Sequence, residues 1–246
     1  MESLYTLLAS EWEGLFPPDE ARHRYLMDSF RRFPGGRILE VGCGTGATAR
    51  RLAEAGFAVT ATDPDSGMVA AAKAADAAAR YDVDDMLGSL GKAGDEAFHG
   101  VLCLGNTLPH LRSSAELTTF FAHCGRVLVP GGRLIVQILA YGAILRKKTV
   151  EMPVLRTDGL EFRRRQISDP TTGFVVFRTE VAAEGRTEIR ENPMLPITAD
   201  DLVGTGTAAG LARATLLGDW DGRTLEPTDP WFVAVFEKGT VGHETI

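Results

Sequence analysis

Residues 37–57 read RILEVGCGTGATARRLAEAGF, and this stretch decides the fold class. An apolar strand over 37–41 leads into glycines at positions 42, 44 and 46, and the pattern of a helix continues to about residue 55. Glycine lets a backbone turn tightly and approach a ligand closely. The spacing is G-x-G-x-G, whereas dinucleotide-binding turns prefer G-x-G-x-x-G. Glu40 precedes the first glycine by two residues, and a carboxylate there attracts a cation and repels a pyrophosphate.

Strands and helices alternate on both sides of this stretch. Residues 2–33 predict two helices broken at Pro17-Pro18. Further strands are expected at 58–62, 81–83, 98–104 and 133–139, helices at 66–79 and 114–128, a loop at 91–96 and a turn at 130–132. Two last strands, at 212–217 and 231–237, suit a hairpin that closes one edge of the sheet. This alternation predicts an α/β fold with a doubly wound, mostly parallel sheet.

The chain divides into four segments. Residues 1–34 are expected to form a helical lid, 35–150 the α/β core, 151–192 an antiparallel β insertion, and 193–246 the completion of the core sheet. Turn signals such as Asp158-Gly159 and Thr172-Gly173 indicate the insertion, which we expect either to cover the substrate mouth or to pair two subunits as a homodimer. Thr198 opens a capping box, although Gly204 and Gly206 each weaken the following helix by roughly 1 kcal/mol.

The composition excludes several classes of protein. The net charge is −7 and no long basic run occurs, which disfavours nucleic acid as the main partner. No apolar stretch reaches membrane-spanning length, and because the N-terminus carries acids and no early Lys or Arg, we do not expect it to be a signal peptide. The three cysteines are too far apart for a metal or redox pair. We therefore expect a cytoplasmic protein with no metal, no nucleic-acid partner and no membrane partner.

A second acid, Asp63, follows the strand at 58–62, at a position from which it can bind a ribose. Asp63 ends the apolar run AVTAT, and a carboxylate at such a strand end can accept hydrogen bonds from both ribose hydroxyls. The alternative is that Asp63 or Asp65 caps the Ala-rich helix that follows. Both interpretations can hold together.

These motifs resemble those of class I S-adenosylmethionine (SAM) dependent methyltransferases. EVGCGTG looks like their motif I, and DVDDM at 82–86, FHGVLCLGNTLPHL at 98–111 and LVPGGRLIV at 128–136 follow in the family's order. The resemblance implies a seven-stranded Rossmann-like sheet and SAM as cofactor. It places Asp85, or Asp84 in its stead, at the adenine amine, Met86 beside the ring, and the Leu104 carbonyl at the methionine ammonium. The implied cofactor-binding set is Glu40, Gly42, Cys43, Gly44, Gly46, Asp63, Pro64, Asp85, Met86 and Leu104.

Two further stretches point to the acceptor. GNTLPHL at 105–111 is similar to the G-N-S-x-x-H-L of glycine and sarcosine N-methyltransferase-like enzymes, so Asn106 is a candidate to bind an acceptor and His110 to take a proton. LASEWEGLF at 8–16 resembles the N-terminal lid of related small-molecule enzymes, with Trp12 in place of a tyrosine. The alternatives are a helix-start histidine bonded to backbone and a tryptophan that only packs. We expect Trp12, Asn106 and His110 to wall one pocket.

The function that follows is methyl transfer to a small molecule. An amine nitrogen is the leading acceptor, because a neutral amine needs no strong base and no catalytic triad is visible. The alternatives are an O-methyltransferase with His110 as base, and a SAM-binding module without catalysis that acts as a sensor or interaction partner. Arg163-Arg164-Arg165 alternate along a strand and predict a solvated face, from which Arg163 or Arg165 can reach an anionic substrate.

Overall fold

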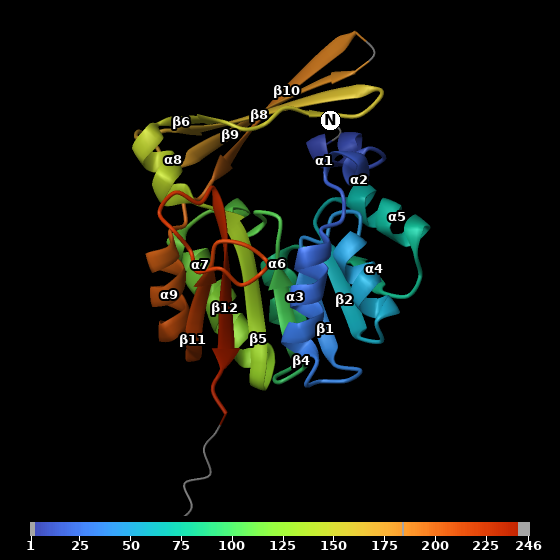
Figure 1. Ribbon diagram of the computed structural model, residues 1–246, viewed down its shortest axis with the longest axis vertical. Coiled ribbons are helices and arrows are strands. Elements are labelled where there is room, and N and C mark those ends of the chain that lie inside the picture. Colours follow the sequence, from blue (N-terminus) through green and yellow to red (C-terminus); the bar gives the residue numbers. More distant parts are fainter. Residues whose placement is uncertain (1–2, 184, 241–246) are drawn as a thin grey trace, which may run out of the picture.

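A seven-stranded sheet forms the centre of the computed structural model, which describes residues 3–183 and 185–240 (Figure 1). The strands lie in the order β11-β12-β5-β4-β1-β2-β3. Among the described strands of this sheet, β12 alone runs in the direction opposite to the others. The expected doubly wound, mostly parallel sheet is confirmed. Its strands are β1 (Arg37–Val41), β2 (Ala58–Asp63), β3 (Arg80–Val83), β4 (Phe98–Cys103), β5 (Leu128–Leu139), β11 (Leu211–Leu217) and β12 (Trp231–Lys238).

Helices cover both faces of this sheet. One layer holds α3 (Glu20–Phe30), α4 (Ala47–Glu54) and α5 (Ser66–Ala75), and the other holds α6 (Met86–Lys92), α7 (Ser114–Val127) and α9 (Ala199–Ala208). Strand β1 shows why two layers are needed, because Ile38 packs into the first and Leu39 into the second. Within residues 3–183 and 185–240, no helix combines the length and the apolar character that crossing a bilayer requires.

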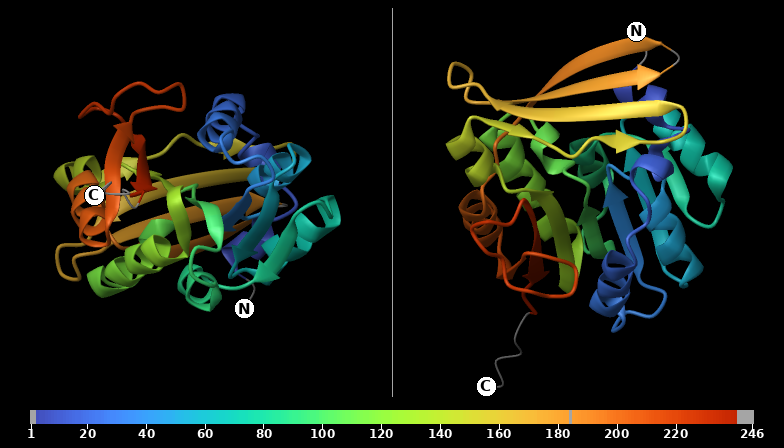
Figure 2. Two further views of the ribbon diagram at one scale, coloured as in Figure 1. Left: turned by 90° about the horizontal axis from the view of Figure 1, so that it is seen from below. Right: turned by 45° about the horizontal axis from the view of Figure 1, so that its top comes forward.

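A second, antiparallel sheet lies over the carboxyl ends of the parallel strands (Figures 1 and 2). We call it the roof sheet; it comprises β6 (Thr149–Glu151), β7 (Leu155–Arg156), β8 (Leu160–Ser168), β9 (Val175–Ala183) and β10 (Arg186–Met194). Its inner face rests on α1 (Leu4–Leu8), α2 (Trp12–Leu15) and α8 (Tyr141–Lys147). The antiparallel insertion is thus present and stands apart from the central sheet.

Several local expectations were wrong. The first N-terminal helix is split into α1 and α2, because α1 binds the loop after β2 whereas α2 binds α4. Helix α6 was missed: Asp85 caps it, but Gly88 and Gly91 weaken the helical pattern. Helix α8 was also missed, and α5 ends at Ala75. Residues 130–132 form a bulge inside β5 opposite β4 and do not separate two elements.

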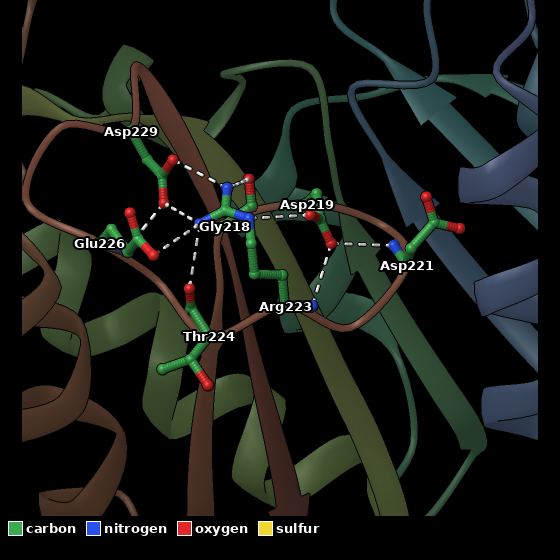
Figure 3. Close-up of polar contacts among 7 residues, drawn as sticks. All are labelled: Gly218, Asp219, Asp221, Arg223, Thr224, Glu226 and Asp229. Atoms are coloured by element: carbon green, nitrogen blue, oxygen red, sulfur yellow. Dashed lines mark hydrogen bonds and ion pairs between the residues drawn. The ribbon is translucent and has the colours of Figure 1, made fainter.

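Arg223 holds together the long connection between β11 and β12 (Figure 3). Its guanidinium bonds the carboxylates of Asp219 and Asp229 at 3.0 and 2.8 Å. The same carboxylates accept from the backbone amides of Asp221, Arg223 and Glu226. The two carboxylates are thus shared by one guanidinium and three turn amides, which fixes this loop where β12 starts beside the end of β5.

The structure explains one of the two glycines in α9. The N-terminus of α9 carries the expected capping box between Thr198 and Asp201. A Cβ built at Gly206 would lie 2.5 Å from Cε1 of Phe236, so glycine there lets α9 pack directly on β12. A Cβ at Gly204 meets nothing within 4 Å, and nothing in the structure explains why glycine stands there.

This difference predicts opposite effects of one substitution at two sites in the same helix. Gly204→Ala should stabilise the protein by about 0.5–1 kcal/mol, because alanine has the higher helix propensity. Gly206→Ala should destabilise it by about 1–3 kcal/mol, because the added methyl overpacks the core against Phe236. Urea denaturation of both variants measures the two changes. A shift of the same sign in both would contradict this account of the packing.

Candidate active site

The end of β2 organises residues 42–46, which we call the glycine loop. The amides of Gly42 and Cys43 donate to the carbonyl of Thr62 at 2.7 and 3.0 Å. One carboxylate oxygen of Asp63 accepts from the Gly44 amide at 2.9 Å, and the other accepts from the Asp65 amide at the same distance. Burial raises the pKa of Asp63 above its usual value, although these amide donors oppose the shift. The glycine loop is therefore held by backbone and carboxylate acceptors at the carboxyl end of one strand.

Glycine is required in this loop on two grounds. Gly42, Gly44 and Gly46 all have left-handed φ angles, of +70°, +55° and +79°. A Cβ at Gly46 would lie 2.6 Å from Cε1 of Tyr81, and one at Gly42 would overlap Thr107. The loop thus lies flat against the ends of β3 and β4. Its backbone forms the floor of the carboxyl edge, with the half-buried Cys43 between the first two glycines.

Glu40 is a buried carboxyl group with one oxygen unpartnered among the described residues. Its side chain is 3% exposed, and within the described chain its Oε2 atom is buried without a hydrogen-bond partner. Burial raises the pKa of Glu40 to about 8, while the more distant Arg22 acts in the opposite direction. A buried carboxylate is costly unless a cation or donors approach it. Glu40 is therefore suited to a cationic ligand group beside the glycine loop.

The loops after β2 and β3 form the next part of this edge. Pro64 is exposed directly after β2, and Met86 is half-buried at the start of α6. Asp84 is bound by Lys92 at 2.7 Å, whereas the exposed Asp85 caps α6 by accepting from the Gly88 amide. An exposed apolar side chain, Val83 at 55%, lies opposite Asp63 in the register of β2 and β3.

Helix α1 is fixed onto the same edge through Asp65. Thr6 donates to the Asp65 carboxylate at 2.8 Å, and Ser3 donates to it as well. Asp65 is also the N-cap of α5. Helix α2 is fixed separately, because Glu13 bonds Arg50 of α4 at 2.9 Å. Two short helices, each with its own polar anchor, therefore lie across the carboxyl edge.

Tyr5 of α1 joins the predicted residues Trp12 and His110. Its hydroxyl lies 3.1 Å from Nε2 of His110, and its ring packs edge-on against the rings of Trp12 and His110 at 5.9 and 6.0 Å. The indole nitrogen of Trp12 would lie 3.4 Å from a Cβ at Gly44, so Trp12 covers the glycine loop.

The pKa values of Tyr5 and His110 are shifted in opposite directions. Burial raises the pKa of Tyr5 to about 12, and the nearby charges of Asp63 and Asp65 add to the rise. The His110 ring keeps an exposed edge, but the atoms crowded around its other sides bury it enough to lower its pKa. A protonated phenol thus faces a neutral imidazole at pH 7.

Asn106 is held by the chain itself. Its Nδ2 donates to the hydroxyl of Tyr141 at 3.2 Å, and its Oδ1 accepts from the Leu139 amide at 3.1 Å. Its φ angle of +66° is left-handed, which asparagine tolerates better than most residues. The Leu104 carbonyl likewise accepts from the hydroxyl and the amide of Thr107, at 2.7 and 3.2 Å. Asn106 therefore positions Tyr141, and a ligand ammonium would have to displace the Thr107 hydroxyl from Leu104.

Sequence reasoning missed Tyr5 and Tyr141. Tyr141 directly follows β5, so the rule that ligands bind at strand carboxyl ends could have identified it. Tyr5 gave no such signal, because its place beside His110 depends on how α1 binds Asp65.

Comparisons with known proteins match the segment of the chain that contains the glycine loop. A family described as a methyltransferase domain matches residues 38–132. The chain is 29% identical to glycine N-methyltransferase of Rattus norvegicus over 49% of this chain and 46% of that one. It is 32% identical to ubiquinone biosynthesis O-methyltransferase of Xanthomonas oryzae over 43% and 44%. The chain thus spans about half the length of these curated relatives.

Solved structures share the architecture. The CcbJ methyltransferase from Streptomyces caelestis matches with a TM-score of 0.79 over 98% of this chain and 100% of that one, at 21% identity. This likeness establishes the fold. The chain therefore has the fold of class I SAM-dependent methyltransferases, and the glycine loop lies inside the part of the chain, residues 38–132, that matches a methyltransferase domain.

Proposed function

We propose that this protein transfers the methyl group of SAM to the nitrogen of a small-molecule amine. The observation that carries the proposal is the hydrogen bond between Tyr5 and His110. It places a neutral base and a phenol between the N-terminal helices and the loop after β4, on the same sheet edge as the glycine loop and Asp63.

The residues at this edge suit SAM. The unpartnered Oε2 of Glu40 would accept from the methionine ammonium, the glycine loop would lie under the methionine portion, and Asp63 would bond the ribose hydroxyls. The exposed Asp85 would face the adenine amine, because Asp84 is engaged by Lys92, while Pro64 and Met86 would flank the ring. Val83 is a further candidate to stack on adenine.

The chain's own residues position the acceptor and manage its proton. SAM supplies an electrophilic methyl group on a sulfonium, so no metal or acid is needed to activate it. His110, neutral at pH 7, accepts the proton that an ammonium must lose before its lone pair can attack. Tyr5 keeps its proton and holds the imidazole through their hydrogen bond. Trp12 covers the glycine loop and excludes water from the site.

Relatives of the chain include enzymes named for N- and for O-methylation, so the acceptor atom needs a direct test. The purified protein with SAM should be incubated with amines and with alcohols or phenols of matched size, and products identified by mass spectrometry. We expect N-methylated products. Products methylated only on oxygen would replace the proposal by O-methylation with His110 as base, and SAM binding without any product would favour a non-catalytic module.

Asp63→Asn should weaken SAM binding. The substitution removes the charge that would accept the ribose hydroxyls, and hydrogen bonds to charged groups contribute about 1.5–3 kcal/mol, or roughly 10- to 150-fold in Kd. Isothermal calorimetry measures the change. Asp95→Asn is the control, because Asp95 pairs with Arg126 at the opposite edge of the sheet. Equal affinity of the wild type and of Asp63→Asn for SAM would show that Asp63 does not bind the cofactor.

His110→Gln should lower kcat/KM by about 100-fold at pH 7, with SAM affinity unchanged. Burial lowers the pKa of His110, so the wild type should lose activity only as the pH falls below about 6.5, where the imidazole becomes protonated. The variant should regain activity as the pH approaches the pKa of the acceptor ammonium, because a free amine needs no base. His23→Gln is the control, since burial also lowers that histidine's pKa but it lies on α3. Failure to recover at high pH would argue against an amine acceptor.

A further inference from the structure

Strand β8 turns alternate side chains toward the site. Phe162 is buried against α1 and α2, so the even-numbered residues of β8 face inward and the odd-numbered residues face outward. Arg163 and Arg165 therefore lie on the outer face, where they pair with Glu161 and Glu151 at 2.6 and 2.5 Å. The expectation that one of these two reaches an anionic substrate was wrong, because the inward arginine is Arg164.

Arg164 lies on the inner face of β8 without a counter-ion among the described residues. Its guanidinium lies over the rings of Phe16 and Phe162, at 5.3 and 5.5 Å, and its Nη2 donates to the Pro153 carbonyl at 3.0 Å. Its Nε is buried without a hydrogen-bond partner, and no carboxylate of the described residues pairs with it. Burial lowers its pKa, as expected for a cation that lacks a compensating charge.

Gln166 is the next inward residue, and it is also unsatisfied. The side chain is 0% exposed, yet in the part of the chain that the structure describes neither its Nε2 nor its Oε1 has a hydrogen-bond partner. Its cross-strand neighbours are Val150 and Phe177, which both pack against the buried cluster that includes Tyr141 and Ile144 of α8. A buried amide without partners is unfavourable unless something else bonds it.

The two groups lie between the two supports of the roof sheet. On one side Phe162 rests on α1 and α2, which carry Tyr5 and Trp12. On the other side Val150 and Phe177 rest on α8, which carries Tyr141. Tyr5 lies near enough to Tyr141 to add to the rise in the Tyr141 pKa that burial causes. Arg164 and Gln166 thus lie on the inner face of the roof sheet between its two supports, and the proposed acceptor would bind beneath them.

We propose that the methyl acceptor carries a carboxylate, which Arg164 and Gln166 bind from the inner face of the roof sheet while the amine faces Tyr5 and His110. This inference rests on the proposed function. A guanidinium offers two parallel N–H groups to a carboxylate, and the amide of Gln166 adds a donor. Arg164 supplies one positive charge, which matches a monoanionic carboxylate better than a phosphate dianion.

The test uses the smallest carboxylate as a probe. Thermal unfolding of the protein with S-adenosylhomocysteine is followed as acetate, acetamide or inorganic phosphate is added at constant ionic strength. Acetate should raise the Tm of the wild type by mass action, and acetamide should not. Arg164→Met, which keeps an unbranched side chain over Phe16, should abolish the response, whereas Arg163→Met on the outer face should retain it. Equal responses of these two variants, no response of the wild type to acetate, or a stronger response to phosphate would overturn the proposal.

The variant Gln166→Leu provides a second test of the carboxylate site if Arg164→Met does not fold. Leucine removes the unpartnered amide at similar volume, so this variant should be at least as stable as the wild type and bind acetate more weakly. A stable variant with undiminished acetate binding would contradict a role for Gln166.

Turnover measurements distinguish the proposed carboxylate site from the proposed N-methylation. With pairs of amino acids and their amides as acceptors, Arg164→Met should lower kcat/KM for the amino acid by about 10- to 100-fold and leave the amide unaffected. Methylation of amides and amino acids at equal rates by the wild type would refute the carboxylate site and leave N-methylation standing. Absence of any N-methylated product would refute the proposed function, while the acetate response is measured independently of turnover.

Discussion

Both the glycine loop and the helices that lie across it depend on the hydrogen bonds that the Asp63 carboxylate accepts. One of its oxygens holds the Gly44 amide, and the other holds the Asp65 amide. The first bond fixes the glycine loop against β2. The second bond orients the turn at Asp65, whose carboxylate accepts a hydrogen bond from Thr6 of α1. Helix α1 also carries Tyr5, which lies beside His110. A single strand end therefore determines where the glycine loop lies and helps to fix the helix α1 that lies across it.

The central sheet could be predicted from sequence because each of its strands carries its own signal. Residues 37–41 are apolar and lead into the glycines, and residues 198–201 read as a capping box, so local sequence and final structure agree. The glycine loop and Asp63 could be assigned for the same reason. Helix α6 could not, because its two glycines weaken the pattern and its stability comes from the Asp85 cap and from packing against the core.

The acceptor side depends on contacts between segments far apart in the chain. Tyr5 and His110 are separated by 105 residues, and their hydrogen bond depends on the place of α1, which the bond of Thr6 to Asp65 and the packing of Leu4 and Leu8 under the roof sheet fix. Likewise, Arg163, Arg164 and Arg165 are chemically equivalent in sequence, and only the register of β8 against β9 and β7 decides which one faces inward. A shift of one residue would exchange the two faces, so an alternating pattern alone could not identify Arg164.

The protein therefore combines three layers at one edge: a glycine loop below, two short helices with separate anchors across it, and a roof sheet that carries Arg164 and Gln166 on its inner face between its supports. The most direct test is a crystal structure with S-adenosylhomocysteine. We expect the ribose to bond Asp63 and the sulfur to point toward the space bounded by Tyr5, His110 and the inner face of β8. A sulfur directed away from that space, with the Tyr5–His110 pair on the far side of the ligand, would contradict it.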